Sequence, residues 1–247
     1  MKREAAENEE SDDFAEDREI SMPQLELSSI VPWGRSLEEY VLMFDLTESD
    51  RRKRILGCGD GPASFNAEWT RDGGSVVSVD PLYQFSAVEI AARIEEIRPT
   101  VMAHVVGHLD SYRWQVIQSP ADLERVRMAA MTRFLEDFET GLVAGRYREG
   151  GLPRLDFADR SFDLALVSHF LFLYSDQIDA DFHWAGIREL LRVAREVRTF
   201  PLQDLSGARS GFVDPVVDAL TEEGRFTAIV NVDYEFQQGA NEMLVIR

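Results

Sequence analysis

Arg54-Ile-Leu-Gly-Cys-Gly-Asp-Gly61, followed by the apolar run Ser75-Val-Val-Ser-Val79 and then by Asp80, decides the fold. This order predicts a strand, a glycine turn, a helix, a second strand and an acidic residue at the end of that strand. Glycine permits a sharp turn and lets a ligand approach bare backbone, while the following helix directs free N–H groups at such a ligand. Asp80 is placed to accept hydrogen bonds from ribose hydroxyls. We therefore expect a ligand that contains a nucleoside.

The residue after the turn distinguishes between nucleoside cofactors. A dinucleotide-binding fingerprint has a third small residue three positions after its second glycine, which allows helix and strand to pack closely. This chain has Pro62 there, which begins a helix well but is neither Gly nor Ala. The sequence thus disfavours an NAD-type oxidoreductase, which remains the third of three candidate functions.

Three motifs resemble those of class I S-adenosylmethionine (SAM)-dependent methyltransferases. Gly57-Cys-Gly-Asp-Gly61 resembles their first motif and Ser78-Val-Asp80 their second. The segment from Leu155 to His169 is similar to the region in which those enzymes pass from the adenine-contacting loop into the fourth strand. The motifs stand in the right order, and the resemblance covers most of residues 35–247. It implies SAM as the cofactor.

The resemblance also implies which residues contact SAM. Arg35 precedes a capped helix, where related enzymes often close a segment over the cofactor, and a guanidinium matches the methionine carboxylate in bidentate geometry. Ser168 ends the fourth strand beside the expected position of the methyl group. The expected cofactor-binding residues are Gly57, Cys58, Gly59, Asp60, Gly61, Asp80, Leu152, Ser168 and Arg35.

Two positions depart from the family pattern. An acidic residue usually stands two positions before the first glycine and helps to fix the methionine end of the cofactor, but this chain has Ile55. Gly150-Gly151-Leu152-Pro153 replaces the usual Asp-Ala pair, so backbone and apolar contacts would hold adenine. Both departures favour a second candidate function, a catalytically silent SAM-binding or scaffold protein.

The periodicity predicts an α/β fold with a Rossmann-like, doubly wound, mainly parallel seven-stranded sheet. A closing antiparallel hairpin is typical of methyltransferases and uncommon in nicotinamide dehydrogenases. Strands are expected at about 53–57, 75–80, 146–148, 162–167, 195–200, 226–232 and 243–246. Helices are expected at about 36–46, 62–72, 86–98, 181–194 and 213–223.

The remaining segments set the domain organisation. Residues 1–20 contain nine acids and few apolar side chains, which predicts a disordered acidic tail before a single domain over 21–247. A helical insertion is expected at about 99–145, where Ser119-Pro-Ala-Asp122 supplies an N-cap. It would lie near the carboxyl ends of the strands, either as a cover over the substrate pocket or as a helical pair that only thickens the domain.

Candidates for chemistry follow the fourth strand. His169 could take a proton from a nucleophilic O, N or S, and Tyr174 and Asp176 could position the substrate. The structural alternative for His169 is a partly buried side chain hydrogen-bonded to backbone. Methyl transfer from an activated sulfonium mainly requires alignment and exclusion of water, so an obvious base is not essential.

Composition limits the possible partners. The net charge of −19 argues against nucleic acid, because binding phosphate chains requires a basic surface. No apolar run reaches ~18 residues and no charged leader precedes an apolar stretch, so we expect a cytoplasmic protein without membrane contact.

Cys58 is the only cysteine, and we interpret it as a packing residue rather than a nucleophile. His104 and His108 lack a third ligand, so no metal is expected. The leading function is methyl transfer to a small-molecule acceptor.

Overall fold

The computed structural model describes residues 31–247, so the predicted acidic tail lies outside the described residues. A seven-stranded sheet has the order β3-β2-β1-β4-β5-β7-β6. The first five strands run parallel, and β7 is antiparallel to both β5 and β6. This confirms the predicted fold class, the fold of class I SAM-dependent methyltransferases. The strands are β1 (Arg54–Cys58), β2 (Ser75–Val79), β3 (Tyr147–Arg148), β4 (Phe162–Ser168), β5 (Ala194–Phe200), β6 (Thr227–Asn231) and β7 (Glu242–Ile246).

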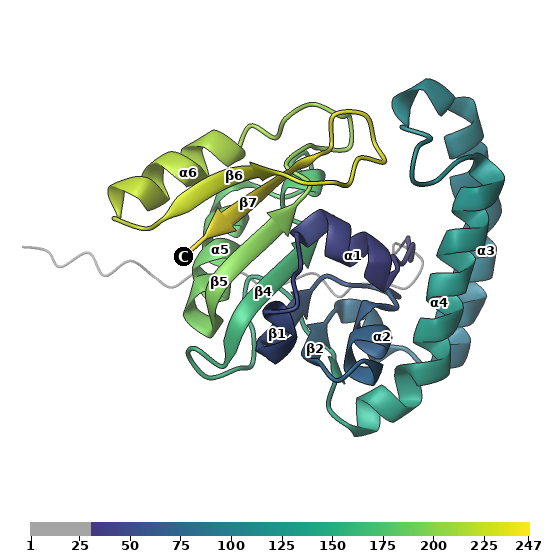
Figure 1. The fold of residues 1–247 in the computed structure, drawn as a ribbon, viewed down its shortest axis with the longest axis horizontal. Helices are drawn as coiled ribbons and strands as arrows, with labels where there is room; N and C mark the ends of the chain where they lie inside the picture. Colours follow the sequence, from purple (N-terminus) through teal and green to yellow (C-terminus); the bar gives the residue numbers. More distant parts are fainter. Residues whose placement is uncertain (1–30) are drawn as a thin grey trace, which may run out of the picture.

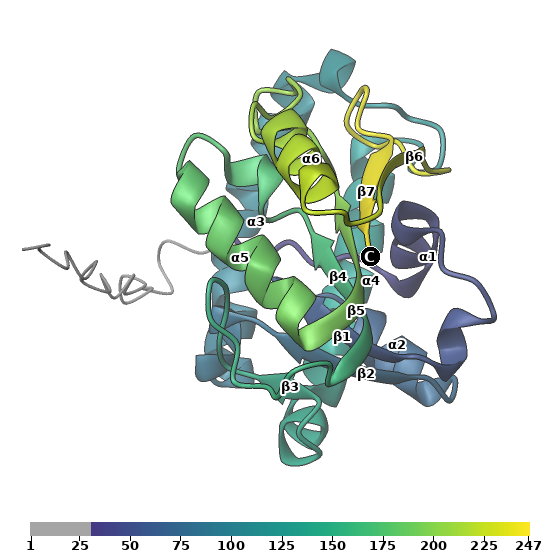
Figure 2. The same ribbon diagram turned by 90° about the vertical axis from the view of Figure 1, so that its left-hand side faces the viewer.

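Helices cover both faces of the sheet (Figure 1), and Figure 2 shows α5 and α6 on the near face. α5 (Ala180–Val193) and α6 (Val213–Glu222) pack on one face, whereas α1 (Leu37–Phe44) and α2 (Phe65–Arg71) pack on the other. β1 contributes Leu56 and Cys58 to the first core and Ile55 to the second. Side chains alternate along a strand, so a strand buried on both faces reads as one apolar run.

Two helices differ from their predicted bounds. α2 begins at Phe65 rather than at Pro62, because Gly61 has a left-handed φ of 53° and the chain needs a further turn before it becomes helical. α3 (Ala87–Gly107) continues through Pro99, although the sequence predicted an end near Arg98. Buried isoleucine and valine side chains continue along α3 on both sides of the proline. Tertiary packing therefore outweighs the cost of the missing N–H group.

α3 and α4 (Pro120–Val143) stand side by side at the β3 edge of the sheet (Figure 1). α4 begins at the predicted N-cap, where the Ser119 hydroxyl accepts the Asp122 N–H at 3.1 Å. The lower part of α4 packs Phe134 and Phe138 against Tyr147. The tip of the pair, residues 109–118, contacts the β6–β7 connection through hydrogen bonds between backbone groups. The pair therefore thickens the sheet edge and also reaches the connection that lies beside the carboxyl end of β5.

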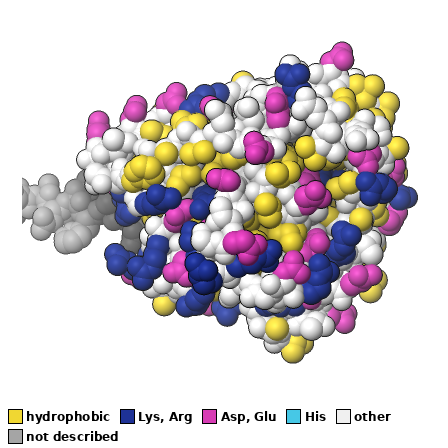
Figure 3. Space-filling view, in the orientation of Figure 1, with side chains coloured by type: hydrophobic (Ala, Val, Ile, Leu, Met, Phe, Trp, Pro, Cys, Tyr) yellow, Lys and Arg dark blue, Asp and Glu magenta, His cyan; other side chains and the backbone are white. Residues whose placement is uncertain are grey.

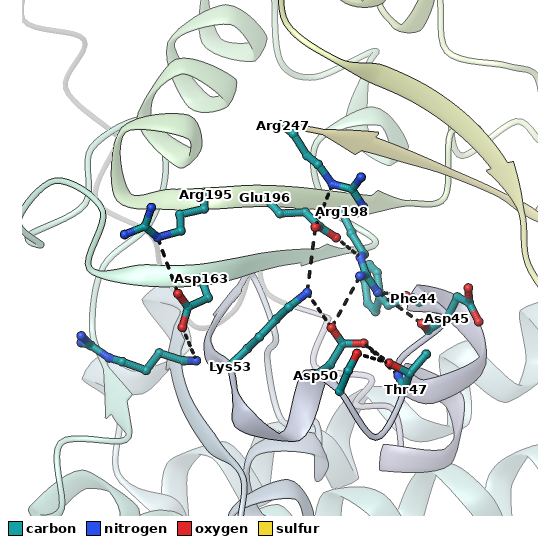
Figure 4. Close-up of polar contacts among 12 residues, drawn as sticks. Phe44, Asp45, Thr47, Asp50, Lys53, Asp163, Arg195, Glu196, Arg198 and Arg247 are labelled. Atoms are coloured by element: carbon teal, nitrogen blue, oxygen red, sulfur yellow. Dashed lines mark hydrogen bonds and ion pairs between the residues drawn. The ribbon is translucent and has the colours of Figure 1, made fainter.

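An ion-pair network joins segments that are distant in sequence, at the edge of the sheet where the parallel strands begin (Figure 4). Arg198 donates to the Phe44 carbonyl at 2.6 Å, which caps the end of α1, and pairs with Glu196 at 2.7 Å. Glu196 also pairs with Arg247 at 3.0 Å, and Asp50 pairs with Lys53 at 2.7 Å. The network fastens α1 and the start of β1 to β5 and β7. Within residues 31–247, none of the helices combines the length and apolarity needed to cross a bilayer.

Candidate functional site

The glycine turn connects β1 to α2 at the carboxyl edge of the sheet. Gly59 and Gly61 have φ of 74° and 53°, a region that glycine occupies without strain. The Gly59 N–H donates to the Val79 carbonyl at 2.9 Å, which ties the turn to the end of β2. A Cβ atom at Gly59 would lie 3.2 Å from Cβ of Phe170, whereas one at Gly61 would meet nothing within 4 Å. The turn is therefore packed on one side and open at Gly61.

Asp80 lies beside this turn, as the motif predicted. Its Oδ2 accepts the Gly61 N–H and its Oδ1 accepts the Leu82 N–H, both at 2.8 Å. Burial raises the pKa of this carboxyl group to about 6. Each oxygen keeps a second lone pair, so the side chain can brace the turn and still accept a hydrogen bond from a hydroxyl of a ligand.

The Asp60 side chain folds back over β1. A Cβ atom at Gly57 would lie 1.8 Å from Asp60 Oδ2, so only glycine leaves room for this carboxylate. The Tyr40 hydroxyl donates to Oδ1 at 2.8 Å, and the Ser78 hydroxyl donates to Oδ2 at 2.5 Å. Burial raises the pKa of Asp60 to about 6. Among residues 31–247, Asp60 forms no ion pair.

Arg35 lies on the segment that precedes α1. This segment is fixed to the turn because the Ser64 N–H donates to the Arg35 carbonyl at 3.0 Å. Among the residues that the structure describes, the guanidinium donates only to the Trp33 carbonyl, at 3.4 Å, and its buried Nε has no hydrogen-bond partner. No carboxylate of the described part of the chain pairs with it. Burial, followed by the nearby Arg127, lowers the pKa of Arg35, which means that its positive charge is poorly compensated.

A buried ion pair lies next to Arg35 and was not foreseen from the sequence. Arg127 of α4 is 1% exposed and pairs with Glu39 of α1, and the Tyr234 hydroxyl donates to Glu39 Oε1 at 2.8 Å. The Glu39 carboxylate thus pairs with Arg127 and acts on Arg35 only through its charge, more weakly than Arg127 does. The available signal was that Arg127 stands four residues after Leu123 and four before Met131, on the apolar face of its helix.

His169 follows β4 and also faces these charges. Its N–H donates to the Phe200 carbonyl at 2.7 Å, and its Nδ1 lies 3.0 Å from the Ser168 hydroxyl. Burial, followed by the charges of Arg35 and Arg127, holds the pKa of His169 well below its usual range. The imidazole is therefore neutral at pH 7, and its φ of 53° is left-handed, a conformation seldom found outside glycine.

The other predicted residues divide between the site and the core. Tyr174 is partly buried, and burial raises its pKa. Smaller effects come from Arg35, which lowers this pKa, and from Asp80, which raises it. Asp176 is exposed. The Leu152 side chain is fully buried and packs under α5, 3.2 Å from the Cβ position of Gly186, and its contact with adenine stays a prediction.

Cys58 and the paired histidines show no reactive arrangement. The Cys58 thiol is buried, and burial raises its pKa, which favours a packing role. His104 and His108 stack on each other with ring centroids 4.3 Å apart. Among residues 31–247, the His, Cys, Asp and Glu side chains form no cluster of three or more that could hold a metal ion.

A surface cavity of about 450 Å³ lies between the tip of the α3–α4 pair and the β6–β7 connection. Tyr112, Trp114 and Gln238 are among its lining residues. Phe236 stacks on Tyr112 with ring centroids 4.9 Å apart and stands two residues after Tyr234, which contacts Glu39. The β6–β7 connection thus links this cavity to the buried charges beside the glycine turn.

A sequence relative defines the family of the chain. No protein-family model matches the sequence. An uncharacterized protein of Methanocaldococcus jannaschii is 32% identical over 227 residues, which cover 92% of this chain and 100% of that protein. The chain belongs to the same family as this protein.

Two solved methyltransferase structures are similar to the chain at low sequence identity. Magnesium protoporphyrin IX methyltransferase from Synechocystis, with bound SAH, matches 85% of this chain and 80% of its own at 11% identity, with a TM-score of 0.47. A SAM-dependent methyltransferase from Aquifex aeolicus matches 84% of this chain and 90% of its own at 12% identity, with a TM-score of 0.41.

Proposed function

We propose that the protein is a SAM-dependent methyltransferase that acts on a small-molecule acceptor. The proposal is carried by one observation: the open glycine turn, Asp80 and the uncompensated charge of Arg35 converge at the carboxyl edge of the sheet. In doubly wound sheets ligands bind at this edge. When bound, SAM supplies a methyl group on a sulfonium, which is already activated for transfer.

The residues of the site fit this cofactor. Free space at Gly61 lets a ligand lie against backbone, and the spare lone pairs of Asp80 suit ribose hydroxyls. Arg35 has a buried Nε without a partner and no paired carboxylate within the described residues. A carboxylate of the methionine moiety would satisfy both, in the bidentate geometry that guanidinium groups favour.

His169 and Tyr174 are the candidates for handling the acceptor. A neutral imidazole can accept a proton from the attacking atom, and a protonated tyrosine hydroxyl can donate a hydrogen bond to hold the acceptor in line. The low pKa of His169 makes it a weak base in the free protein. A carboxylate bound at Arg35 would cancel part of the positive field that acts on His169.

A small acceptor is supported by charge and by space. The chain carries a net charge of −19, and acidic and basic side chains are intermixed on the face shown in Figure 3, which suits a phosphate chain poorly. The cavity beside the β6–β7 connection, about 450 Å³, is within the usual range for small ligands. The alternative is a catalytically silent SAM-binding protein, which Ile55 in place of the usual acidic residue favours.

Calorimetry with SAM, S-adenosylhomocysteine (SAH) and NAD tests the cofactor. We expect binding of the first two and not of NAD, and binding of NAD alone would overturn the proposal. Transfer of a labelled methyl group from SAM to pooled small molecules then tests activity. Tight SAM binding with no transfer to any pool, including extracts of the source cells, would favour the silent protein.

A further inference from the structure

The first observation concerns the face of β1 on which an acidic group stands. Ile55 and Gly57 project to the same side of the sheet, because side chains alternate along a strand. Ile55 is fully buried against the helices of that side. The place of a Gly57 side chain is taken by the Asp60 carboxylate, whose Oδ2 lies 1.8 Å from the position of a Cβ atom there. An acidic group therefore occupies the Ile55 side of the strand, nearer to its carboxyl end.

The second observation concerns the charge of this group. Asp60 is 7% exposed, and its hydrogen-bond donors are the uncharged hydroxyls of Tyr40 and Ser78. Neutral donors offset only part of the cost of burying a carboxylate, and a cation would offset much more. Among the described residues no Lys, Arg or His pairs with Asp60. Each carboxylate oxygen retains one lone pair for such a cation.

The third observation is that the site contains two opposite charges that do not pair with each other. Tyr40 donates to Asp60 within the glycine turn, and the Arg35 carbonyl accepts the N–H of Ser64, which follows that turn, so both charged residues stand on segments that meet at the turn. Within residues 31–247, Arg35 pairs with no carboxylate and Asp60 pairs with no cation. A zwitterionic amino acid carries one group of each kind on a single carbon atom. The pattern of missing partners is therefore complementary to such a group.

From these observations we infer that Asp60 binds the α-ammonium group of the methionine moiety of SAM, in place of the acidic residue that is absent at Ile55. The inference rests on the proposed function. Tyr40 and Ser78 hold the carboxylate in position, and Arg35 receives the carboxylate of the same moiety. The ammonium group donates to the free lone pairs of Asp60, which makes a charge-assisted hydrogen bond.

The test compares wild type with Asp60→Asn for three ligands in calorimetry: SAH, SAH without its amino group, and 5′-methylthioadenosine, which lacks the whole amino-acid end. In wild type, loss of the amino group should weaken binding by roughly tenfold or more. Asp60→Asn should weaken SAH by a similar factor, should abolish the preference for the amino group, and should leave methylthioadenosine unchanged. Asp72→Asn removes an exposed charge beyond α2 and should leave all three affinities unchanged.

The outcomes separate the inference from the function on which it rests. Wild type that binds neither SAH nor methylthioadenosine overturns both. If wild type binds SAH and methylthioadenosine, and Asp60→Asn weakens the two affinities equally or not at all, only the role of Asp60 is overturned. If Asp60→Asn fails to fold, the comparison of SAH with SAH that lacks its amino group still tests the inference in wild type. Equal affinities of wild type for the two ligands would overturn the inference, and a clear preference for SAH with its amino group would support it.

Discussion

Replacing Asp60 with Asn is expected to stabilise the free protein at neutral pH. Burial raises the pKa of this carboxyl group from 3.8 to about 6, and its two hydroxyl donors oppose this rise only in part. A shift of about two units corresponds to roughly 3 kcal/mol of destabilisation by the ionised form. Asn has the same shape without the charge, but gives up one acceptor oxygen at a cost of about 1 kcal/mol. The expected gain in the free energy of unfolding is therefore on the order of 1–2 kcal/mol.

The pH dependence of this gain identifies its cause. A carboxyl group whose pKa is higher in the folded state binds a proton more tightly when the protein is folded. Its ionised form destabilises the protein above about pH 6, and this penalty is lost as the pH falls towards 3.8. The advantage of the variant should therefore be largest at neutral pH and disappear in acid. The pKa of Asp80 is also raised to about 6, but this group titrates in both proteins, so the difference between them removes most of its contribution.

Urea denaturation of wild type and Asp60→Asn at about pH 4.5 and about pH 7.5 measures this difference. Asp72→Asn serves as the control, because Asp72 is exposed and its replacement should change stability little at either pH. A variant that is less stable than wild type by the same amount at both pH values would refute the reasoning. That result would mean that folding does not raise the pKa of Asp60.

Three further predictions concern the same region. Asp80→Ala should weaken SAM binding by roughly 1.5–3 kcal/mol, or ten- to a hundred-fold in calorimetry, because charge-assisted hydrogen bonds to the ribose are lost. Unchanged SAM affinity would contradict the assignment of Asp80 to the ribose, and Asp72→Ala is the matched control. Arg35→Ala should weaken SAM by about tenfold or more and leave 5′-methylthioadenosine unchanged, whereas equal effects on both ligands, or none, would exclude Arg35 as the carboxylate anchor. Glu39→Gln should lower the free energy of unfolding by about 3–5 kcal/mol in urea denaturation, because it leaves Arg127 charged and buried. The double variant with Arg127→Met should recover much of that loss, and a double variant as unstable as the single one would contradict this explanation.

The buried charges of Arg35 and Asp60 are expected to reduce the stability of the free protein. Buried groups without partners reduce stability, and natural proteins retain them mainly where a ligand completes the set. Here Arg35 lies on the segment before α1, and Asp60 lies within the glycine turn itself. A ligand that supplies both missing charges would gain affinity from groups that the fold has already desolvated and oriented.

The sequence by itself determined the sheet and the position of the turn. All seven strands lie within one or two residues of their predicted bounds, because strand periodicity and runs of buried residues are local properties. Gly59 and Gly61 adopt the positive φ values that a sharp turn requires, and Asp80 stands beside them because the spacing of the motif sets where β2 ends. The helix after Arg35 is capped as predicted, by a capping box whose two partners, Ser36 and Glu39, lie within one helical turn.

Only the tertiary structure decided how charges are paired and where the remaining side chains point. Arg127 and Glu39 are 88 positions apart, so no local pattern reveals their ion pair. The same is true of the Leu152 side chain, which enters the core, and of the continuation of α3 through Pro99. That Arg35 and Asp60 have no ion-pair partner among the described residues also follows from what each neighbouring segment contributes. Burial and charge compensation depend on packing between segments distant in the chain, whereas strand and turn signals depend on neighbours in sequence.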